Sequence, residues 1–325
     1  MESVPATTHA PLRLPSHLRK NRGGFTHRGQ ITATMRQGGL HTVCEQARCP
    51  NIGECFSHGT ATFMILGDTC TRRCHFCAVK TGRPLPPNPN EPESLAQAAV
   101  SMKLEHVVIT SVDRDDLPDY GATHFARCIQ AVRAACPKAT IEILTPDFKG
   151  NTNAVDVVLD AQPDVFNHNI ETVERLYKKV RPQSSWETTT ALLRYVAKTG
   201  HTAVKSGLMV GLGETDDEVS ETLALLKSLG VHIATIGQYL RPTLKHWVVN
   251  RYVEPATYEQ WVQEGRSLGL SHVFAGPFVR SSYNAAEAMR DHQKKQGLNK
   301  MEQESKDREP EKRTSVGRTT LPIVS

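Results

Sequence analysis

Six of the eight cysteines lie between residues 44 and 77, in two groups of three. The second group, Cys70, Cys74 and Cys77, has the spacing CxxxCxxC. Structural zinc sites have four ligands, whereas three thiolates on one loop suit a [4Fe–4S] cluster with one iron left open. The spacing therefore predicts an iron–sulfur cluster, and a zinc site completed from elsewhere in the chain is the alternative.

The first group, Cys44, Cys49 and Cys55, has the spacing CxxxxCxxxxxC and ends only 15 residues before Cys70. Two adjacent triads favour two clusters, although one triad could be structural and the other catalytic. A secreted disulfide protein would be short and rich in cysteine throughout, and this chain of 325 residues is neither. Cys128 and Cys136 stand apart on a predicted helix, where small buried side chains are favoured over ligands.

Short β-branched stretches alternate with amphipathic ones after residue 35. The expected strands are Ala61–Gly67, His106–Ser111, Thr140–Thr145, Asp164–Asn169, Thr202–Leu212, His232–Leu240 and Ser271–Ala275. The expected helices cover residues 92–103, 120–135, 153–161, 186–199, 215–229 and 255–269. Thr215 and Glu218 form a capping box, Gly230 marks a helix end, and Pro255 suits a first turn.

This alternation predicts an α/β fold, a parallel sheet covered by helices. Right-handed crossovers would curl the sheet into a partial (β/α)6 barrel of the TIM type, and an open doubly wound sheet is the alternative. A barrel carries its active loops at the carboxyl ends of its strands. The Cys70 group directly follows the first expected strand and so lies where an active site is expected.

Composition divides the chain into four regions. We expect a flexible extension over 1–34, a second cluster segment over 35–60, the barrel over 61–288, and a polar, disordered tail with a frayed first helix over 289–325.

The net charge of +5 belongs to the two ends of the chain. Residues 1–30 carry five Lys and Arg against one acidic residue, and residues 290–325 carry nine against six. The rest holds 25 basic and 27 acidic groups, which does not favour a nucleic-acid-binding protein. No apolar run approaches the roughly 18 residues of a membrane span, and no secretory signal is evident. We therefore expect a cytoplasmic protein that acts away from membranes.

The Cys70 motif C-T-R-R-C-H-F-C resembles the signature of the radical S-adenosylmethionine superfamily. The upstream motif C-E-Q-A-R-C-P-N-I-G-E-C resembles the lipoyl synthase family within it. Further motifs of that family recur between residues 25 and 287: V-I-T-S-V-D-R-D-D-L-P-D-Y-G (108–121), E-I-L-T-P-D-F-K-G (142–150), N-H-N-I-E-T-V (167–173), K-S-G-L-M-V-G-L-G-E-T (205–215) and G-P-F-V-R-S-S-Y (276–283).

The resemblance implies two [4Fe–4S] clusters and S-adenosylmethionine as cofactors. The open iron of the Cys70 cluster would chelate S-adenosylmethionine, and an electron would cleave it to a 5′-deoxyadenosyl radical that removes hydrogen from an alkyl chain. The Cys44 cluster would give up sulfide, which is inserted at carbons 6 and 8 of an octanoyl group on a carrier lysine. In some two-cluster relatives the second cluster is instead an electron conduit.

The resemblance also implies roles for individual residues. Ser282 of R-S-S-Y would be the releasable fourth ligand of the second cluster, with Arg280 steering it, although Ser282 could be an ordinary loop hydroxyl. Asn284 and Arg241 depart from the family pattern, which affects substrate fit. Phe76 would flank the adenine or exclude solvent. Further candidate contacts to S-adenosylmethionine are Thr110, Ser111, Asp113, Glu142, Asn169 and Lys205, although Lys205 could be a solvated strand lysine and His168 a structural histidine.

The implied partners are proteins. The octanoyl group would arrive on lipoyl carrier domains, either of 2-oxoacid dehydrogenase acyltransferase subunits or of the glycine cleavage H protein. A flavodoxin or ferredoxin would donate electrons, and a cluster-repair protein would rebuild the consumed cluster. A zinc-stapled scaffold protein is the alternative from another functional class.

Overall fold

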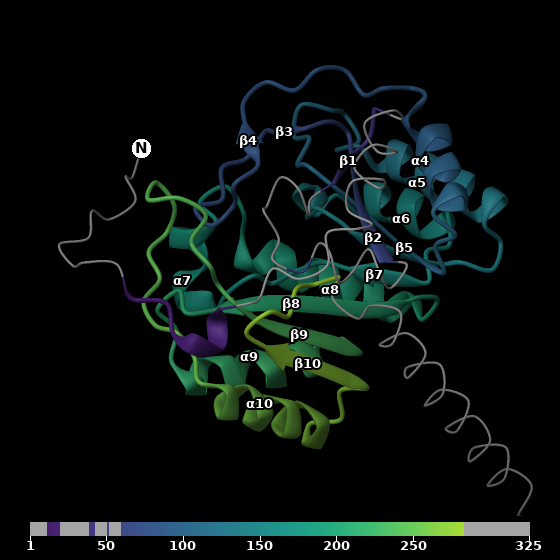
Figure 1. Ribbon diagram of the computed structural model, residues 1–325. Coiled ribbons are helices and arrows are strands. Elements are labelled where there is room, and N and C mark those ends of the chain that lie inside the picture. Colours follow the sequence, from purple (N-terminus) through teal and green to yellow (C-terminus); the bar gives the residue numbers. More distant parts are fainter. Residues whose placement is uncertain (1–11, 20–38, 43–50, 52–59, 283–325) are drawn as a thin grey trace, which may run out of the picture.

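The computed structural model describes residues 12–19, 39–42, 51 and 60–282. Their main feature is an eight-stranded sheet in the order β1-β2-β5-β6-β7-β8-β9-β10 (Figure 1). Strand β1 is antiparallel to β2, and every other neighbouring pair is parallel. The strands are β1 His41–Thr42, β2 Thr60–Ile65, β5 His106–Ser111, β6 Thr140–Leu144, β7 Val165–Asn167, β8 Ala203–Val210, β9 Ile233–Gln238 and β10 His272–Gly276, with a separate pair β3 Thr69–Cys70 and β4 Lys80–Thr81.

The parallel strands follow one another in space in the same order as in the chain. A doubly wound sheet reverses direction at a switch point, and the order from β2 to β10 has none, so that alternative is wrong. Six strand–helix units precede β10, as the sequence predicts. Among the described residues no ladder joins β10 to β1 or β2, and the sheet is a partial barrel.

Helices fill the connections between the parallel strands. Figure 1 shows α4 beside α5, and α9 beside α10 along strands β8 to β10. All six expected helices are present, and α7 is an additional one. The helices are α4 Glu91–Ser101, α5 Ala122–Ala135, α6 Thr152–Asp160, α7 Glu174–Val180, α8 Trp186–Thr199, α9 Asp216–Ser228 and α10 Pro255–Ser267, with 3-10 turns η1 Ser16–Leu18 and η2 Phe148–Gly150.

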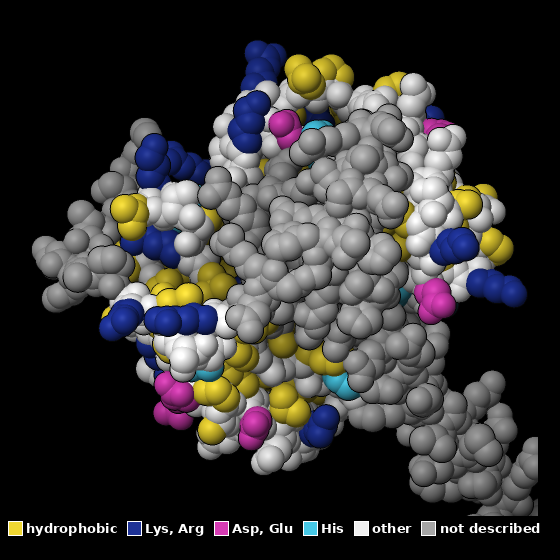
Figure 2. All heavy atoms as spheres, in the orientation of Figure 1, with side chains coloured by type: hydrophobic (Ala, Val, Ile, Leu, Met, Phe, Trp, Pro, Cys, Tyr) yellow, Lys and Arg dark blue, Asp and Glu magenta, His cyan; other side chains and the backbone are white. Residues whose placement is uncertain are grey.

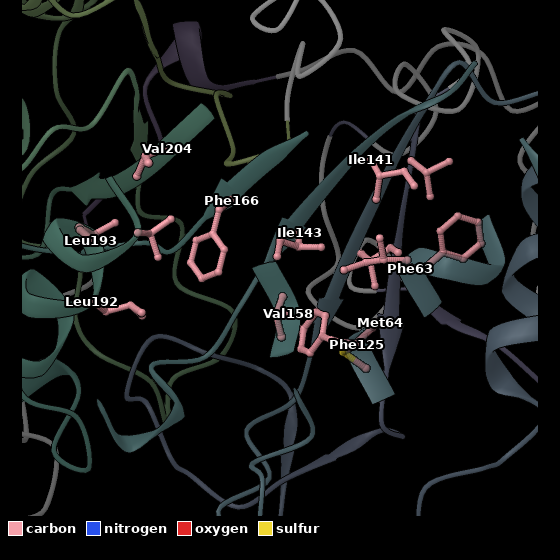
Figure 3. Close-up of a cluster of buried hydrophobic side chains, with 14 of the residues drawn as sticks. Phe63, Met64, Phe125, Ile141, Ile143, Val158, Phe166, Leu192, Leu193 and Val204 are labelled. Atoms are coloured by element: carbon pink, nitrogen blue, oxygen red, sulfur yellow. The ribbon is translucent and has the colours of Figure 1, made fainter. Parts of the chain in front are cut away.

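The main hydrophobic core lies between the sheet and its helices (Figure 3). Ile141 and Ile143 of β6 belong to this core, together with Phe125 of α5 and Val158 of α6. Glu142 lies between the two isoleucines and points to the opposite face, because strand side chains alternate. It is only 1% exposed. Both faces of the strand are therefore buried, which explains the nearly continuous apolar runs in the sequence.

The predicted helix signals are confirmed. Thr215 accepts a hydrogen bond from the amide of Glu218, and the Glu218 carboxylate accepts one from the amide of Thr215. Gly230 has a φ of 88° after the end of α9, and a Cβ there would lie 2.6 Å from the Cβ of Ala197. Pro255 is in the first turn of α10.

The region boundaries proposed from composition stay predictions. Most of the regions 1–34 and 35–60, and all of 289–325, lie outside the described residues. Within 12–19, the side chain of Leu18 is 3% exposed. None of the described helices combines the length and apolar content that crossing a membrane requires.

Figure 2 shows charged side chains of both signs spread over one face of the molecule. One group of Lys and Arg side chains stands at the upper edge over β4, where Lys80 and Arg83 are exposed. This basic group lies close to Cys70, because β4 pairs with β3.

Replacing Thr215 by alanine should lower the free energy of unfolding by about 1 kcal/mol, because the amide of Glu218 in the first turn of α9 loses the side-chain oxygen that caps it. Urea denaturation followed by circular dichroism measures this. Ser228→Ala at the exposed end of the same helix is the control, and it should change stability by less than about 0.5 kcal/mol. Equal effects of the two variants would contradict the role of the capping box.

Candidate functional site

Cys70, Cys74 and Cys77 lie on one loop that begins in β3 at the carboxyl end of β2. Backbone hydrogen bonds fix this loop on three sides. The amide of Thr71 donates to the carbonyl of Asp113 after β5. The amide of His75 donates to the carbonyl of Val180 in α7. The amide of Trp247 donates in turn to the carbonyl of His75. We call residues 70–77 the cysteine loop.

The three thiols of the cysteine loop face one cavity of about 550 Å³. Burial raises the pKa of Cys70 and Cys74 to about 12 and that of Cys77 to about 11. Free thiols here stay neutral near pH 7, and a metal must displace their protons to bind.

Three sulfur donors on one loop fit a [4Fe–4S] cluster, whose ligands attach to different irons. In residues 12–19, 39–42, 51 and 60–282, no three His, Cys, Asp or Glu side chains meet closely enough to hold a single metal ion.

The cavity lies at the carboxyl ends of the strands and gathers most of the predicted site residues. Those that line it come from the cysteine loop, from β5, from the segments after β5 and β7, and from the segment after β10. They are Cys70, Cys74, Phe76, Cys77, Thr110, Ser111, Asp113, Asn169, Arg280 and Ser282.

Two predicted contacts, Glu142 and Lys205, do not line the cavity. Lys205 Nζ lies 2.9 Å from Glu142 Oε1, and both side chains are about 1% exposed. Asn167 donates a hydrogen bond to the same carboxylate oxygen. Glu142 and Lys205 each stand two positions before a cavity residue on the same strand, Leu144 and Gly207, so they point to the same side one layer deeper. The ion pair therefore lies in the barrel interior beneath the cavity. Lys205 is buried there, so its ammonium group is not solvated.

Several polar atoms around the cavity are buried without a hydrogen-bond partner. They are Ser111 Oγ, Thr145 Oγ1 and Asn169 Oδ1. Buried polar groups are nearly always paired, so three partnerless atoms in one cavity indicate a polar ligand. Thr110 differs, because its hydroxyl donates to the carbonyl of Leu144 at 2.9 Å. The cavity thus has donors and acceptors available for a molecule such as S-adenosylmethionine.

Asp113 joins the cavity to the cysteine loop. Its Oδ2 accepts a weak hydrogen bond from Cys70 Sγ at 3.5 Å. Burial raises the pKa of Asp113, although the neighbouring guanidinium groups of Arg72 and Arg181 oppose this rise. The carboxylate therefore lies where it can meet both the first cysteine and a cation in the cavity.

The sequence comparisons agree with these features. The family model for the radical SAM superfamily matches residues 64–226. The lipoyl synthase of Dechloromonas aromatica (strain RCB) is 53% identical over 283 residues, covering 86% of this chain and 90% of the relative. That of Methylococcus capsulatus is 52% identical, covering 85% and 86%. The chain belongs to the lipoyl synthase family. Membership implies a [4Fe–4S] cluster and S-adenosylmethionine as cofactors.

Solved structures share the fold at low sequence identity. A crystal structure of HydG, a maturase of the [FeFe]-hydrogenase, has a TM-score of 0.54 at 12% identity, covering 82% of this chain and 70% of that one. Methylornithine synthase (PylB) has a TM-score of 0.52 at 13% identity, covering 78% and 83%. These similarities support the α/β fold alone.

The segment that carries the family's R-S-S-Y motif packs closely over the end of β9. A Cβ added to Gly237 would lie 2.2 Å from the carbonyl oxygen of Val279. Only glycine leaves room for the segment here. Arg280 turns its guanidinium back onto the carbonyl of Val279 at 2.6 Å. Ser282 follows and lines the cavity.

The second cysteine triad lies outside the described residues, but one residue inside its motif is described. Asn51 stands between Cys49 and Cys55 and is 1% exposed. Its side-chain amide donates to the carbonyl of Phe278 at 2.5 Å. The fold thus brings the middle of the upstream motif to within four residues of Ser282.

Arg241, which departs from the family pattern, stabilises the loop that it belongs to. Its guanidinium donates to the carbonyls of His246 and Leu244. His246 Nε2 in turn lies 3.0 Å from the carbonyl of Cys77. Arg241 therefore closes the loop that packs on the cysteine loop. The other departure, Asn284, lies outside the described residues.

Phe76 lines the cavity and also packs against a second hydrophobic cluster, which includes Val173, Leu176 and Val180. Contact with the adenine and exclusion of solvent, the two interpretations from the sequence, are therefore compatible. His168 has a structural environment, because it contacts the carbonyl of Thr145 and the hydroxyl of Thr189. Burial lowers its pKa to about 4.

Cys128 is fully buried in the hydrophobic core, and Cys136 is partly buried and packs against that core.

Arg181 and Glu171 are cavity residues that the sequence did not indicate. Arg181 is 6% exposed, donates to the hydroxyl of Tyr177, and leaves Nε without a hydrogen-bond partner. Burial alone would lower its pKa, but Tyr177, Cys74 and Glu171 raise it. Burial also raises the pKa of Glu171. A buried cation beside Cys74 suits a carboxylate ligand.

Replacing Gly207 by alanine should weaken binding of S-adenosylmethionine at least tenfold. A Cβ there would lie 2.4 Å from Thr235 Oγ1 and 3.0 Å from Asn169 Oδ1, and would displace the cavity's polar groups. Equilibrium binding to the anaerobically reconstituted protein measures the effect.

Gly82→Ala is the matched control, because its Cβ would make only an ordinary contact of 3.5 Å with Thr69. The assignment of the cavity would be contradicted if both variants bound S-adenosylmethionine as tightly as the wild type.

Proposed function

We propose that this lipoyl synthase family member inserts two sulfur atoms at carbons 6 and 8 of an octanoyl group held on a carrier lysine. The observation that carries the proposal is that the cysteine loop, the partnerless polar atoms and the R-S-S-Y segment all meet at one cavity. Cys70, Cys74 and Cys77 would hold the first cluster. When bound and reduced, that group would supply the one electron that splits S-adenosylmethionine into methionine and a 5′-deoxyadenosyl radical, and this radical would remove hydrogen from an unactivated carbon.

The cavity residues bind and orient S-adenosylmethionine. Arg181 suits its carboxylate, because its Nε is buried and without a partner. Asp113 suits its amino group, because it is a carboxylate beside Cys70. Ser111 and Asn169 offer hydrogen bonds to the ribose. Phe76, packed against the hydrophobic cluster that includes Val173 and Leu176, excludes water from the radical.

A second cluster on Cys44, Cys49, Cys55 and Ser282 is the substrate that supplies the sulfur. The contact from Asn51 to Phe278 supports this, because it ties the upstream motif to the serine segment. A hard serine oxygen is a poor match for an iron–sulfur site. Such a ligand leaves readily, as a cluster that is consumed requires.

The proposed substrate partner is an octanoylated carrier domain, from an acyltransferase subunit of a 2-oxoacid dehydrogenase or the glycine cleavage H protein. A flavodoxin or ferredoxin supplies the electron, and a cluster-repair protein restores the second cluster. The exposed cations over β4 favour acidic surfaces on partners that dock beside the cysteine loop (Figure 2).

A single-turnover assay tests the source of the sulfur. With an octanoyl carrier peptide, S-adenosylmethionine, a reductant and no added sulfide, each chain should form about one lipoyl group and then stop, because its own cluster is consumed. Product is counted by mass spectrometry against 5′-deoxyadenosine. Radical formation with no product sulfur would favour an electron-conduit role for the second cluster.

Ser282→Ala should still produce 5′-deoxyadenosine but lose at least tenfold in lipoyl formation, because the second cluster lacks its fourth ligand. Ser281→Ala, a change of the same size one residue away, is the control. Equal lipoyl yields from the two variants would show that Ser282 is an ordinary loop hydroxyl.

A further inference from the structure

Arg72 lies within the cysteine loop, between Cys70 and Cys74, yet its side chain is buried. It is only 2% exposed, whereas its neighbour Arg73 extends into solvent. Burying a guanidinium is costly unless hydrogen bonds and opposite charges compensate it. The surroundings of Arg72 must therefore supply that compensation.

Two carboxylates each form a bidentate pair with the Arg72 guanidinium. Asp115 accepts from Nε and Nη2, both at 2.8 Å. Asp147 accepts from Nη1 at 2.8 Å and from Nη2 at 2.7 Å. Ser184 Oγ lies 3.3 Å from Nη1. Bidentate pairs of this kind fix orientation as well as charge.

These contacts connect the cysteine loop to three other segments of the barrel rim. Asp115 follows β5, Asp147 follows β6, and Ser184 follows α7. A third carboxylate, Asp113 beside Cys70, lies 3.4 Å from Nη1. One side chain thus joins the iron-binding loop to the strand ends that form the cavity.

The charges around Arg72 do not balance without it. Asp113, Asp115 and Asp147 all face this guanidinium. Lys149 reaches Asp115 only from the more exposed side, at 3.3 Å, and Arg181 acts on Asp113. Burial would raise the pKa of Asp147, but its contacts with Arg72 lower it to about 2. Losing the Arg72 guanidinium leaves Asp147, whose side chain is only 2% exposed, without its ion pair, which is strongly unfavourable.

We propose that Arg72 is a positioning residue for the first cluster: by gripping Asp115 and Asp147 it fixes the cysteine loop on the barrel rim and places a buried positive charge beside the cluster. The inference rests on the cluster proposed above. A nearby positive charge stabilises the reduced, more negative state of the cluster. Arg72 therefore sets the reduction potential as well as the loop geometry.

The experiment compares full-length wild type with Arg72→Gln, Arg72→Lys and Arg73→Gln after anaerobic reconstitution. The readouts are the electron paramagnetic resonance spectrum and midpoint potential of the first cluster, and the rate of 5′-deoxyadenosine formation. Arg72→Gln should show an altered spectrum, a more negative potential and at least a tenfold slower rate. Arg72→Lys keeps the charge and should restore the potential with an intermediate rate. Arg73→Gln should match the wild type.

An Arg72→Gln protein with wild-type spectrum, potential and rate would overturn the inference. If that variant does not fold, Asp115→Asn removes one bidentate pair and keeps the guanidinium buried, and an unchanged spectrum there would also overturn it. A wild-type chain that binds no cluster would instead overturn the proposed function itself.

Discussion

The candidate site depends on one constraint, which is that the seven strands from β2 to β10 are all parallel. All seven carboxyl ends, from β2 to β10, then lie on the same rim. Residues far apart in the sequence, such as Cys70 and Ser282, meet there at one cavity. One layer deeper, Glu142 and Lys205 compensate each other's charge in the interior.

The second requirement is that the cysteine loop keep its shape before metal arrives. Its thiols are buried among apolar and acidic groups, and burial keeps them protonated. They gain nothing from one another until iron binds. Hydrogen bonds from the loop backbone to Asp113 and Val180, and the bidentate pairs of Arg72, supply the stability that the thiols do not. The loop is therefore organised by its non-cysteine residues.

Most of the framework could be predicted from the sequence, because strand and helix periods are local signals. His106–Ser111 and Trp186–Thr199 match their predicted bounds, and the cysteine spacing alone indicated the cluster. Short elements were not predicted. β3 and β4 have two residues each, and the seven-residue α7 was missed, so Arg181 after it was not recognised as a cavity residue.

Other features could not be predicted, because they depend on how deep a side chain lies in the barrel or on contacts between residues far apart in the sequence. Glu142 and Lys205 were expected at the cavity, but only the strand register shows that they lie two positions too deep. The contact between Asn51 and Phe278 joins residues 227 positions apart, and no local pattern predicts it. The burial of Arg72 next to the exposed Arg73 is likewise decided by the tertiary position of Asp115 and Asp147.

The most direct test of the account is the number of iron and sulfide ions per chain after anaerobic purification and reconstitution. Two [4Fe–4S] clusters, one on each cysteine triad, require about eight of each per chain. A count of about four would leave one triad without a cluster and contradict sulfur insertion from a second cluster. Zinc in place of iron would contradict the account as a whole.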